Sequence, residues 1–286
     1  TASGGGFVTP AYIPGFVDLR QRQLTVLDLI TRIQTTSDTI TYVREDTFTN
    51  AAAFTAEATA TTGTSGTKPE GTLAYSRQTA PVKTAAWWVP VTNRLLADAP
   101  AIRGIIDSRL LLGLDLALET QIIEGDGTGE NFTGIVNTAN VLTQVTTAGS
   151  EINDIFNMML KVEVSGKLMA NGVVIHPNQW KTLRLARENA ATGTLGSYLM
   201  GPPNAIGTPT IWGIPVVKAL GITAGRVIVG DFSPLGINLF DREEAAVRMG
   251  WINDQFVRNM QTLLAELRAA LVVWRPSAFC VLTGMA

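Results

Sequence analysis

The longest regular pattern of apolar positions in the chain lies between Asp98 and Asn131. Apolar side chains recur there at intervals of three and four residues, which places them on one face of a helix. The stripe consists of Ile102, Ile105, Ile106, Leu110, Leu114, Leu118, Ile122 and Ile123. Asp98 can accept the free N–H groups of a first helical turn, and Pro100 stands where a missing N–H costs nothing. The glycines of Gly125–Gly129 are typical of a turn that ends a helix.

Three further leucines widen this stripe most of the way round the helix: Leu111, Leu112 and Leu116. A helix that is apolar on several sides must be covered on several sides. We therefore expect Asp98–Gly125 to be a spine against which other segments pack.

The segments before the spine predict an arm and a long hairpin. Residues 1–23 contain Gly4–Gly6, Pro10 and Pro14 and read as an extended arm. Residues 24–33 have a short helical pattern, and Thr39–Thr49 alternates as a strand does. From Thr49 to Pro81 the chain turns to Ala, Thr, Gly and Ser, which cannot form a core. This tract is predicted to be the far end of a two-stranded hairpin that continues to Trp88. Because an isolated hairpin is marginal in water, we expect a neighbouring subunit to support it.

Helices and strands alternate after the spine, as in an α/β domain. Helices are predicted at Ile152–Val164 and Gln179–Glu188, followed by a Gly- and Pro-rich loop up to Pro209. Strands are predicted at Gly172–Ile175, Thr210–Val217, Arg226–Val229, Ile237–Phe240 and Ala245–Met249. Thr262–Trp274 is ambiguous, because its leucines have helical spacing while its end is β-branched.

Composition narrows the function. With 286 residues, 46% of them hydrophobic, the chain can bury the core of one large or two ordinary domains. Its formal net charge of -2 and the lack of any Lys/Arg run argue against a dedicated nucleic-acid binder or a basic membrane-surface protein. No apolar run reaches the ~18 residues of a spanning helix. The only cysteine is Cys280 and the only histidine is His176, which excludes an internal disulfide, a Cys-based zinc cluster and a multi-His metal site.

The motifs with candidate chemistry have simple structural interpretations. Gly125–Asn131 holds carboxylates among glycines, but it lacks the ligand spacing of an EF-hand and does not open a helix after a strand, so a helix-ending turn is favoured. His176 precedes a proline and is interpreted as a packed or capping residue. Cys280 is interpreted as a buried small hydrophobe. We expect no metal and no cofactor.

Ten short motifs, in order over nearly the whole chain, resemble the major capsid protein of tailed bacteriophages of the Hong Kong 97 type. They are Val43-Arg44-Glu45, Phe48-Thr49-Asn50, Lys68-Pro69-Glu70, Gln78-Thr79-Ala80, Val82-Lys83-Thr84, Asp98-Ala99-Pro100, Gly125–Gly129, Trp212–Val217, Asn259-Met260 and Arg275-Pro276. The resemblance is weakest in residues 53–67 and 138–167.

The resemblance implies an α+β fold in four parts. The N-terminal arm would be residues 1–23, and the extended hairpin, called the E-loop, residues 47–88. The peripheral domain with the spine helix would comprise residues 24–46, 89–132 and 241–274, and the axial domain residues 133–240 and 275–286.

The resemblance also implies a structural protein of the virion, not an enzyme. Hexamers and pentamers of such a subunit form an icosahedral shell around double-stranded DNA, without sequence-specific binding and with no membrane. Portal, protease and decoration proteins are further partners of such shells. Members of the family are commonly made with an N-terminal scaffolding region that a phage protease removes, which would account for a chain that begins at Thr1.

Some relatives join neighbouring subunits by an autocatalytic isopeptide bond between a hairpin lysine and an asparagine, assisted by a glutamate. The resemblance places these roles on Lys68, Asn259 and Glu266. A desolvated lysine loses its proton more readily, and a nearby carboxylate can accept it. The alternative is that Lys68 is a solvated loop residue, Asn259 a turn residue, and Glu266 an ion-pair partner of Arg268 or another cation.

Two other functions are weighed against the viral capsid. An encapsulin-type nanocompartment shares the fold but encloses cargo enzymes. A soluble α/β enzyme is disfavoured by the single histidine and cysteine and by the absence of a nucleotide-binding loop.

Overall fold

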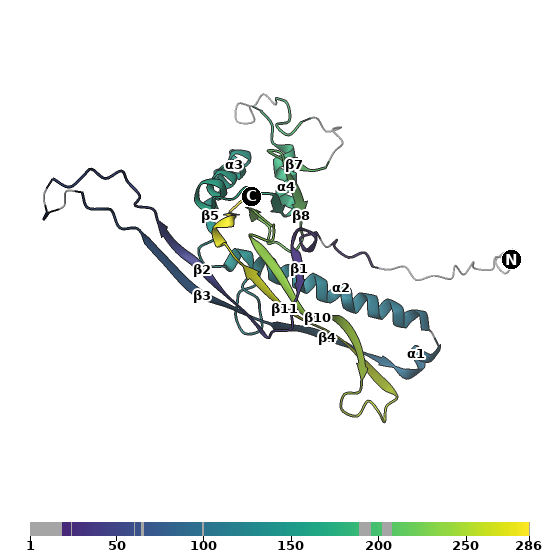
Figure 1. Ribbon diagram of the computed structural model, residues 1–286. Coiled ribbons are helices and arrows are strands. Elements are labelled where there is room, and N and C mark those ends of the chain that lie inside the picture. The colour runs from purple at the N-terminus through teal and green to yellow at the C-terminus, as the bar shows by residue number, and fades with distance from the viewer. Residues whose placement is uncertain are drawn as a thin grey trace, which may run out of the picture.

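A computed structural model describes residues 19–23, 25–59, 61–63, 66–98, 100–188, 196–201 and 208–285. Figure 1 shows a body of two sheets with a long helix, from which a narrow hairpin projects. The predicted arm, residues 1–23, lies outside the described residues as far as residue 18. The part that is described lies on the long helix, where the Arg22 guanidinium donates to the Leu116 carbonyl at 2.6 Å and the Arg109 guanidinium donates to the Leu19 carbonyl at 3.0 Å.

The predicted spine is helix α2, Pro100–Glu124, preceded by the short helix α1, Asn93–Asp98. Asp98 is therefore the last residue of α1 and not a cap in front of a single helix. The predicted end is confirmed, since the helix stops at Glu124. Burial confirms the predicted stripe over the last four turns, where five of its members are at most 2% exposed: Leu110, Leu114, Leu118, Ile122 and Ile123.

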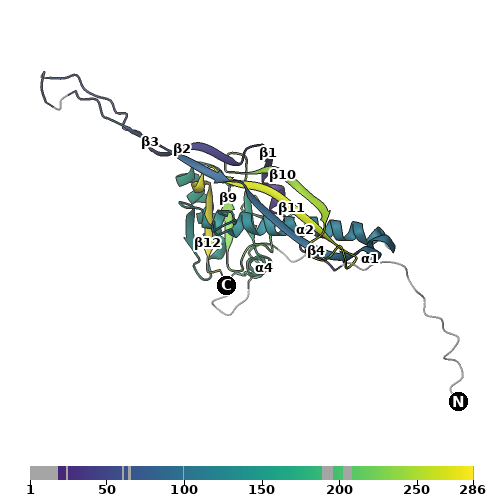
Figure 2. The same cartoon turned by 90° about the horizontal axis from the view of Figure 1, so that it is seen from below.

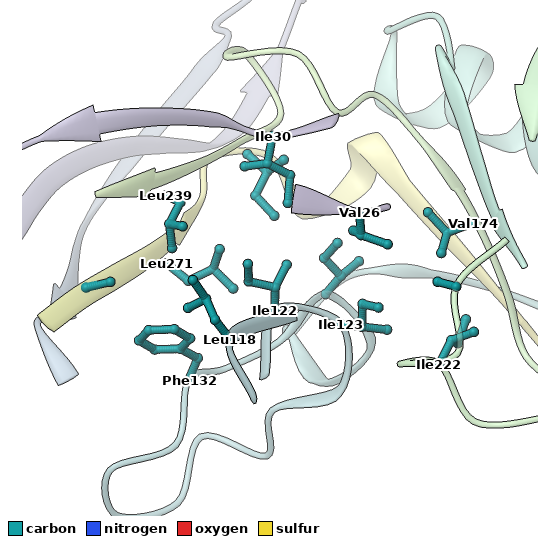
Figure 3. Packing of buried hydrophobic residues seen from close by; sticks show 14 of the residues in the cluster. Val26, Ile30, Leu118, Ile122, Ile123, Phe132, Val174, Ile222, Leu239 and Leu271 are labelled. Atoms are coloured by element: carbon teal, nitrogen blue, oxygen red, sulfur yellow. The ribbon is translucent and has the colours of Figure 1, made fainter. Parts of the chain in front are cut away.

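The buried face of α2 packs on a four-stranded sheet in the order β1-β10-β11-β4. The strands are β1 Thr31–Gln34, β10 Ile237–Gly250, β11 Met260–Val273 and β4 Lys83–Thr92. Figure 3 shows side chains of this core, with Leu118 and Ile122 of the helix close to Leu239 and Leu271 of the sheet. The side of the sheet that faces away from α2 is called here the outer face.

Three predictions for this sheet are corrected. The ambiguous Thr262–Trp274 is strand β11, and the two predicted strands Ile237–Phe240 and Ala245–Met249 are parts of the one strand β10. The short helix predicted in residues 24–33 is wrong apart from a single 3-10 turn, Leu27–Leu29, because the residues that follow pair with β10 as strand β1.

The predicted strand Thr39–Thr49 is confirmed as β2 with the same bounds, and it pairs antiparallel with β3, Thr72–Pro81. These two strands form a separate two-stranded sheet that runs away from the body in both views (Figures 1 and 2). After Val82, β3 continues directly into β4, so the hairpin is joined to the edge strand of the four-stranded sheet.

The second part of the body is a six-stranded sheet in the order β5-β12-β9-β6-β8-β7. Its strands are β5 Leu142–Val145, β12 Phe279–Thr283, β9 Val227–Gly230, β6 Gly172–Ile175, β8 Ile214–Lys218 and β7 Thr210–Ile211. Its helices are α3 Glu151–Lys161, extended by the π-helical turn Val162–Gly166, and α4 Pro177–Leu185, with 3-10 turns at Ile135–Asn137 and Pro276–Ala278.

The alternation of helices and strands predicted after the spine is confirmed, and the bounds of β6 are the predicted ones. Two details differ. The predicted strand Thr210–Val217 is the hairpin β7-β8, because Trp212 and Gly213 both have positive φ and reverse the chain. Helix α4 ends at Leu185, before the predicted Glu188, and residues 189–195 and 202–207 of the predicted loop lie outside the described residues.

Candidate functional site

Lys68 lies in the connection between β2 and β3 that forms the tip of the hairpin, four residues before β3, and its side chain is exposed. Asn259 lies at the far end of the body, directly before β11. Strands β3 and β4 have ten residues each, so at a rise of about 3.3 Å per residue they span about 65 Å. The hairpin tip and the loop that joins β10 to β11 lie at opposite ends of the molecule in both views (Figures 1 and 2).

Asn259 closes the loop between β10 and β11. Its φ of 55° lies in the left-handed region, where asparagine is tolerated better than most residues. Its backbone carbonyl accepts a hydrogen bond from the Asn93 N–H at 2.9 Å, which fixes the backbone at this point. The Asn259 side chain is exposed, so its carboxamide is accessible from outside the chain.

Glu266 lies in the middle of β11. Alternate residues of β11, such as Ala265 and Leu267, are buried against α2, so Glu266 points to the outer face of the sheet. Its neighbours across the strands are Ala246 on β10 and Ala86 on β4, both exposed. Because alanine is short, the adjoining strands leave the carboxylate uncovered at its sides, and its side chain is 26% exposed.

The cation nearest to Glu266 is Arg248 of β10, with 3.8 Å between Nη1 and Oε2. The same guanidinium donates to Glu243 at the shorter distance of 3.2 Å. Arg268, the partner considered from the sequence, instead donates to Asp38 at the base of the hairpin at 3.3 Å. Arg248 was missed in the sequence, although its place two residues from Ala246 in an alternating strand puts it on the same face as Glu266.

The three residues Lys68, Asn259 and Glu266 do not meet in one chain. Asn259 and Glu266 are seven residues apart along an extended strand, or about 23 Å. Lys68 is farther from both of them. Any bond that uses all three must therefore take them from different copies of the chain.

Large apolar side chains without cover gather on the same two projecting parts. On the hairpin, Val43, Phe48, Leu73 and Tyr75 are each more than half exposed, and Phe54 is fully exposed. On the loop between β10 and β11, Trp251 and Phe256 contact each other with 5.9 Å between ring centroids, and both remain more than half exposed. Exposed apolar side chains in this number are typical of protein–protein contact surfaces.

The glycine-rich turn after α2 is structural, as predicted. Asp126 accepts hydrogen bonds from the Thr128 hydroxyl at 2.7 Å, the Thr128 N–H at 3.0 Å and the Asn131 amide at 2.8 Å. These bonds lower the pKa of Asp126 to about 2. Gly127 and Gly129 have positive φ, whereas Gly125 does not and continues the helical hydrogen bonding to Gln121. The carboxylate is thus engaged by its own loop.

The single histidine and cysteine have the predicted structural roles. His176 caps helix α4, its Nδ1 accepting the Asn178 N–H at 3.2 Å. Cys280 is fully buried, and burial raises the pKa of its thiol to about 11. In the part of the chain that the structure describes, no three His, Cys, Asp or Glu side chains lie together as a metal site would require. The described helices include none whose length and apolar character would let it cross a bilayer.

Comparison with known proteins gives consistent results. Residues 4–284 match the phage capsid family. The chain is 36% identical over 278 residues to the major capsid protein of Enterobacteria phage HK97, with 96% of this chain and 69% of that protein covered.

Among solved structures, the capsid of a native GTA particle is similar with a TM-score of 0.76 at 19% identity, covering 100% of this chain and 98% of that chain. A chain of Microbacterium phage Oxtober96 has a TM-score of 0.74 at 19% identity, with 97% and 96% covered. The α+β capsid fold of Hong Kong 97 type that the sequence predicts is confirmed. The chain belongs to the phage capsid family.

Proposed function

We propose that this chain is the major capsid protein of a tailed bacteriophage, the subunit of an icosahedral shell and a component of the virion. One observation supports it most directly: the hairpin of β2 and β3 leaves the body and exposes apolar side chains for which the described part of its own chain offers no cover. A part of this kind gains its stability from a neighbouring copy. Membership of the phage capsid family supports the same function. The alternative function, that of a soluble enzyme, has no such support.

Within the shell, we propose that copies form hexamers and pentamers that enclose double-stranded DNA. With a formal net charge of -2, the chain fits a container that makes no sequence-specific contacts to the genome. The division into arm, E-loop, peripheral domain and axial domain, with the bounds expected from the resemblance, is part of this proposal. So are portal, protease and decoration proteins as partners, and proteolytic removal of an N-terminal scaffolding region.

We also propose that neighbouring copies become joined by an isopeptide bond. The neutral Lys68 amine attacks Cγ of Asn259, the new C–N bond forms, and the bond from Cγ to Nδ2 breaks so that ammonia leaves. Glu266 accepts the proton of the attacking nitrogen and returns it to the leaving group. Because Asn259 and Glu266 lie about 23 Å apart in one chain, the proposal assigns the three residues to three copies.

Mature particles boiled in SDS test both parts of the proposal. The expected result is a ladder of covalent oligomers or material too large to enter the gel, and Lys68→Tyr or Asn259→Asp should restore the monomer. Two matched controls should keep the ladder. Lys181→Tyr changes an exposed lysine of α4, and Asn253→Asp changes an exposed asparagine of the same loop that also has positive φ, 51°.

A single monomer band from mature wild-type particles would refute the crosslink and leave the shell function standing. Electron microscopy of the same particles tests the shell itself. Particles that contain DNA support the viral capsid, whereas DNA-free shells that hold enzymes would support the encapsulin alternative.

A further inference from the structure

The tip of the hairpin carries two opposite charges side by side. Lys68 and Glu70 are both exposed and are separated only by Pro69, which holds the chain in a restricted conformation. Two residues of chain span at most about 7 Å, so the two charges lie close together. Among the described residues neither side chain has an ion-pair partner, so both charges are available to another molecule.

The outer face of the four-stranded sheet carries two opposite charges at a similar spacing. Arg248 lies across from Leu264 and Trp88, and Glu266 lies in the next row across the strands, between Ala246 and Ala86. Two rows on the same face are separated by two residues along each strand, again about 7 Å. The two alanines beside Glu266 are exposed, so no longer side chain of β10 or β4 stands in that row.

The position of Arg248 matters for the chemistry of Glu266. A guanidinium 3.8 Å from the carboxylate occupies part of the space that an incoming amine needs in order to reach it. In the single chain Arg248 lies between two carboxylates, 3.2 Å from Glu243 and 3.8 Å from Glu266, and its side chain is 59% exposed. A new carboxylate on its exposed side can therefore turn it away from Glu266 with little rearrangement.

We propose that Glu70 of one copy binds Arg248 of another copy, and that this ion pair places Lys68 beside Glu266. The inference rests on the proposed crosslinking function and names the partner surface for the hairpin tip. Glu70 is a positioning residue: it sets the register of the tip and draws Arg248 away from Glu266, which leaves that carboxylate open to the Lys68 amine. For Lys68 to meet Glu266 while Glu70 meets Arg248, the segment from Lys68 to Glu70 must run antiparallel to β11. It then runs from the row of Glu266 towards the row of Leu264, in which Arg248 lies.

Charge reversal in assembled particles tests the pair. Glu70→Arg and Arg248→Glu are each expected to slow the formation of covalent oligomers about tenfold, the order expected when one partner of a partly covered charge pair is reversed. The double variant should recover most of the wild-type rate, a rescue that a merely structural role would not give. Glu57→Arg, elsewhere on the hairpin tip, and Arg103→Glu, on an exposed face of α2, are controls that should not change the rate.

A second measurement does not depend on the isopeptide bond. In particles that carry Lys68→Tyr together with Glu70→Cys and Arg248→Cys, a short bis-maleimide reagent should join neighbouring subunits into dimers and larger species. The native Cys280 is fully buried and does not compete for the reagent. Arg103→Cys in place of Arg248→Cys is the matched control and should give monomer only.

The outcomes separate this inference from the proposed function. If wild-type particles crosslink but the double charge reversal is as slow as the single ones, the pairing of Glu70 with Arg248 is refuted and the crosslink stands. If the bis-maleimide yields only monomers, the pairing is likewise refuted. Maleimide-linked subunits in the absence of any wild-type isopeptide bond would support the docking surface and refute the crosslink.

Discussion

Replacing Leu118 by alanine is expected to lower the free energy of unfolding by about 3 to 4 kcal/mol. Leu118 is 2% exposed and lies in the core between α2 and the sheet, close to Leu239 and Leu271 (Figure 3). The substitution removes three carbon atoms, worth about 2.4 kcal/mol in transfer free energy at about 0.8 kcal/mol each. The rest is the cost of the cavity, because side chains held by both α2 and β11 relax only in part.

The assay is thermal unfolding of unassembled subunits, followed by differential scanning calorimetry at one fixed scan rate. An unfolding entropy of about 2.1 cal/mol/K per residue gives about 0.6 kcal/mol/K for 286 residues, so a loss of about 3 to 4 kcal/mol corresponds to a fall in Tm of about 5 to 7 °C. Tryptophan fluorescence gives a second readout, because the Trp87 indole donates to the Leu110 carbonyl of the same helix at 2.9 Å.

Leu112→Ala is the matched control. Leu112 is only partly buried and lies about a third of a turn round the helix from Leu118. Its replacement should cost less than about 1 kcal/mol and lower Tm by less than about 2 °C. Equal losses for Leu118 and Leu112 would contradict the closer packing of Leu118 in the core of the single subunit.

Three further predictions concern Cys280, Asp126 and two glycines. Cys280, whose pKa is raised to about 11 by burial, should react with iodoacetamide in folded subunits at pH 8 about 100-fold or more slowly than a cysteine peptide, and alkylation at the peptide's rate would contradict its burial. Hydrogen bonds from Thr128 lower the pKa of Asp126 to about 2, so the ionised carboxylate stabilises its loop above about pH 4, and this contribution is lost as pH falls towards 2. Amide hydrogen exchange in the loop should therefore accelerate between about pH 4 and about pH 2 by more than its intrinsic pH dependence. Above about pH 5 no such acceleration is expected. Gly127→Ala places a Cβ 2.6 Å from a hydroxyl oxygen at a residue whose φ is 73°, so it should lower the free energy of unfolding by about 1 to 3 kcal/mol, measured by calorimetry. Gly104→Ala places a Cβ in open space on helix α2 and should raise the free energy of unfolding by up to about 1 kcal/mol.

The sequence predicts an element well where a local pattern and its tertiary environment agree. Thr39–Thr49 alternates in a hairpin that has only one neighbouring strand, so the alternation survives unchanged in β2. Gly172–Ile175 is a continuous apolar run, and all four of its residues are buried in β6. The long stripe of α2 is repeated over so many turns that no competing period fits it.

The prediction fails where two periods coincide or where the partner is remote in sequence. In β11, Leu263, Leu267 and Leu271 are spaced by four, which fits one helix face and equally one strand face, because four is a multiple of two. Residues 31–34 are a strand only because they pair in parallel with β10, about two hundred residues later. No local pattern contains that partner.

The candidate site could be predicted only in part, for a related reason. The resemblance assigns roles to Lys68, Asn259 and Glu266 one by one, but their separation becomes clear only when β3, β4 and β11 are placed in space. The outer-face arrangement of Arg248 beside Glu266 depends on the register of β10 against β11, which includes two irregularities that cannot be counted from the sequence.

The strand order of the four-stranded sheet has a consequence for folding during translation. Strands β1 and β4 come from the first third of the chain, but the two strands that lie between them, β10 and β11, are synthesised near its end, with only β12 after them. During synthesis the apolar face of α2 therefore stays exposed, without the sheet that covers it, until nearly the whole chain has left the ribosome. Folding dominated by such distant pairings is slow and leaves the chain prone to aggregate. Newly made subunits are accordingly expected to depend on chaperones until β11 closes the sheet.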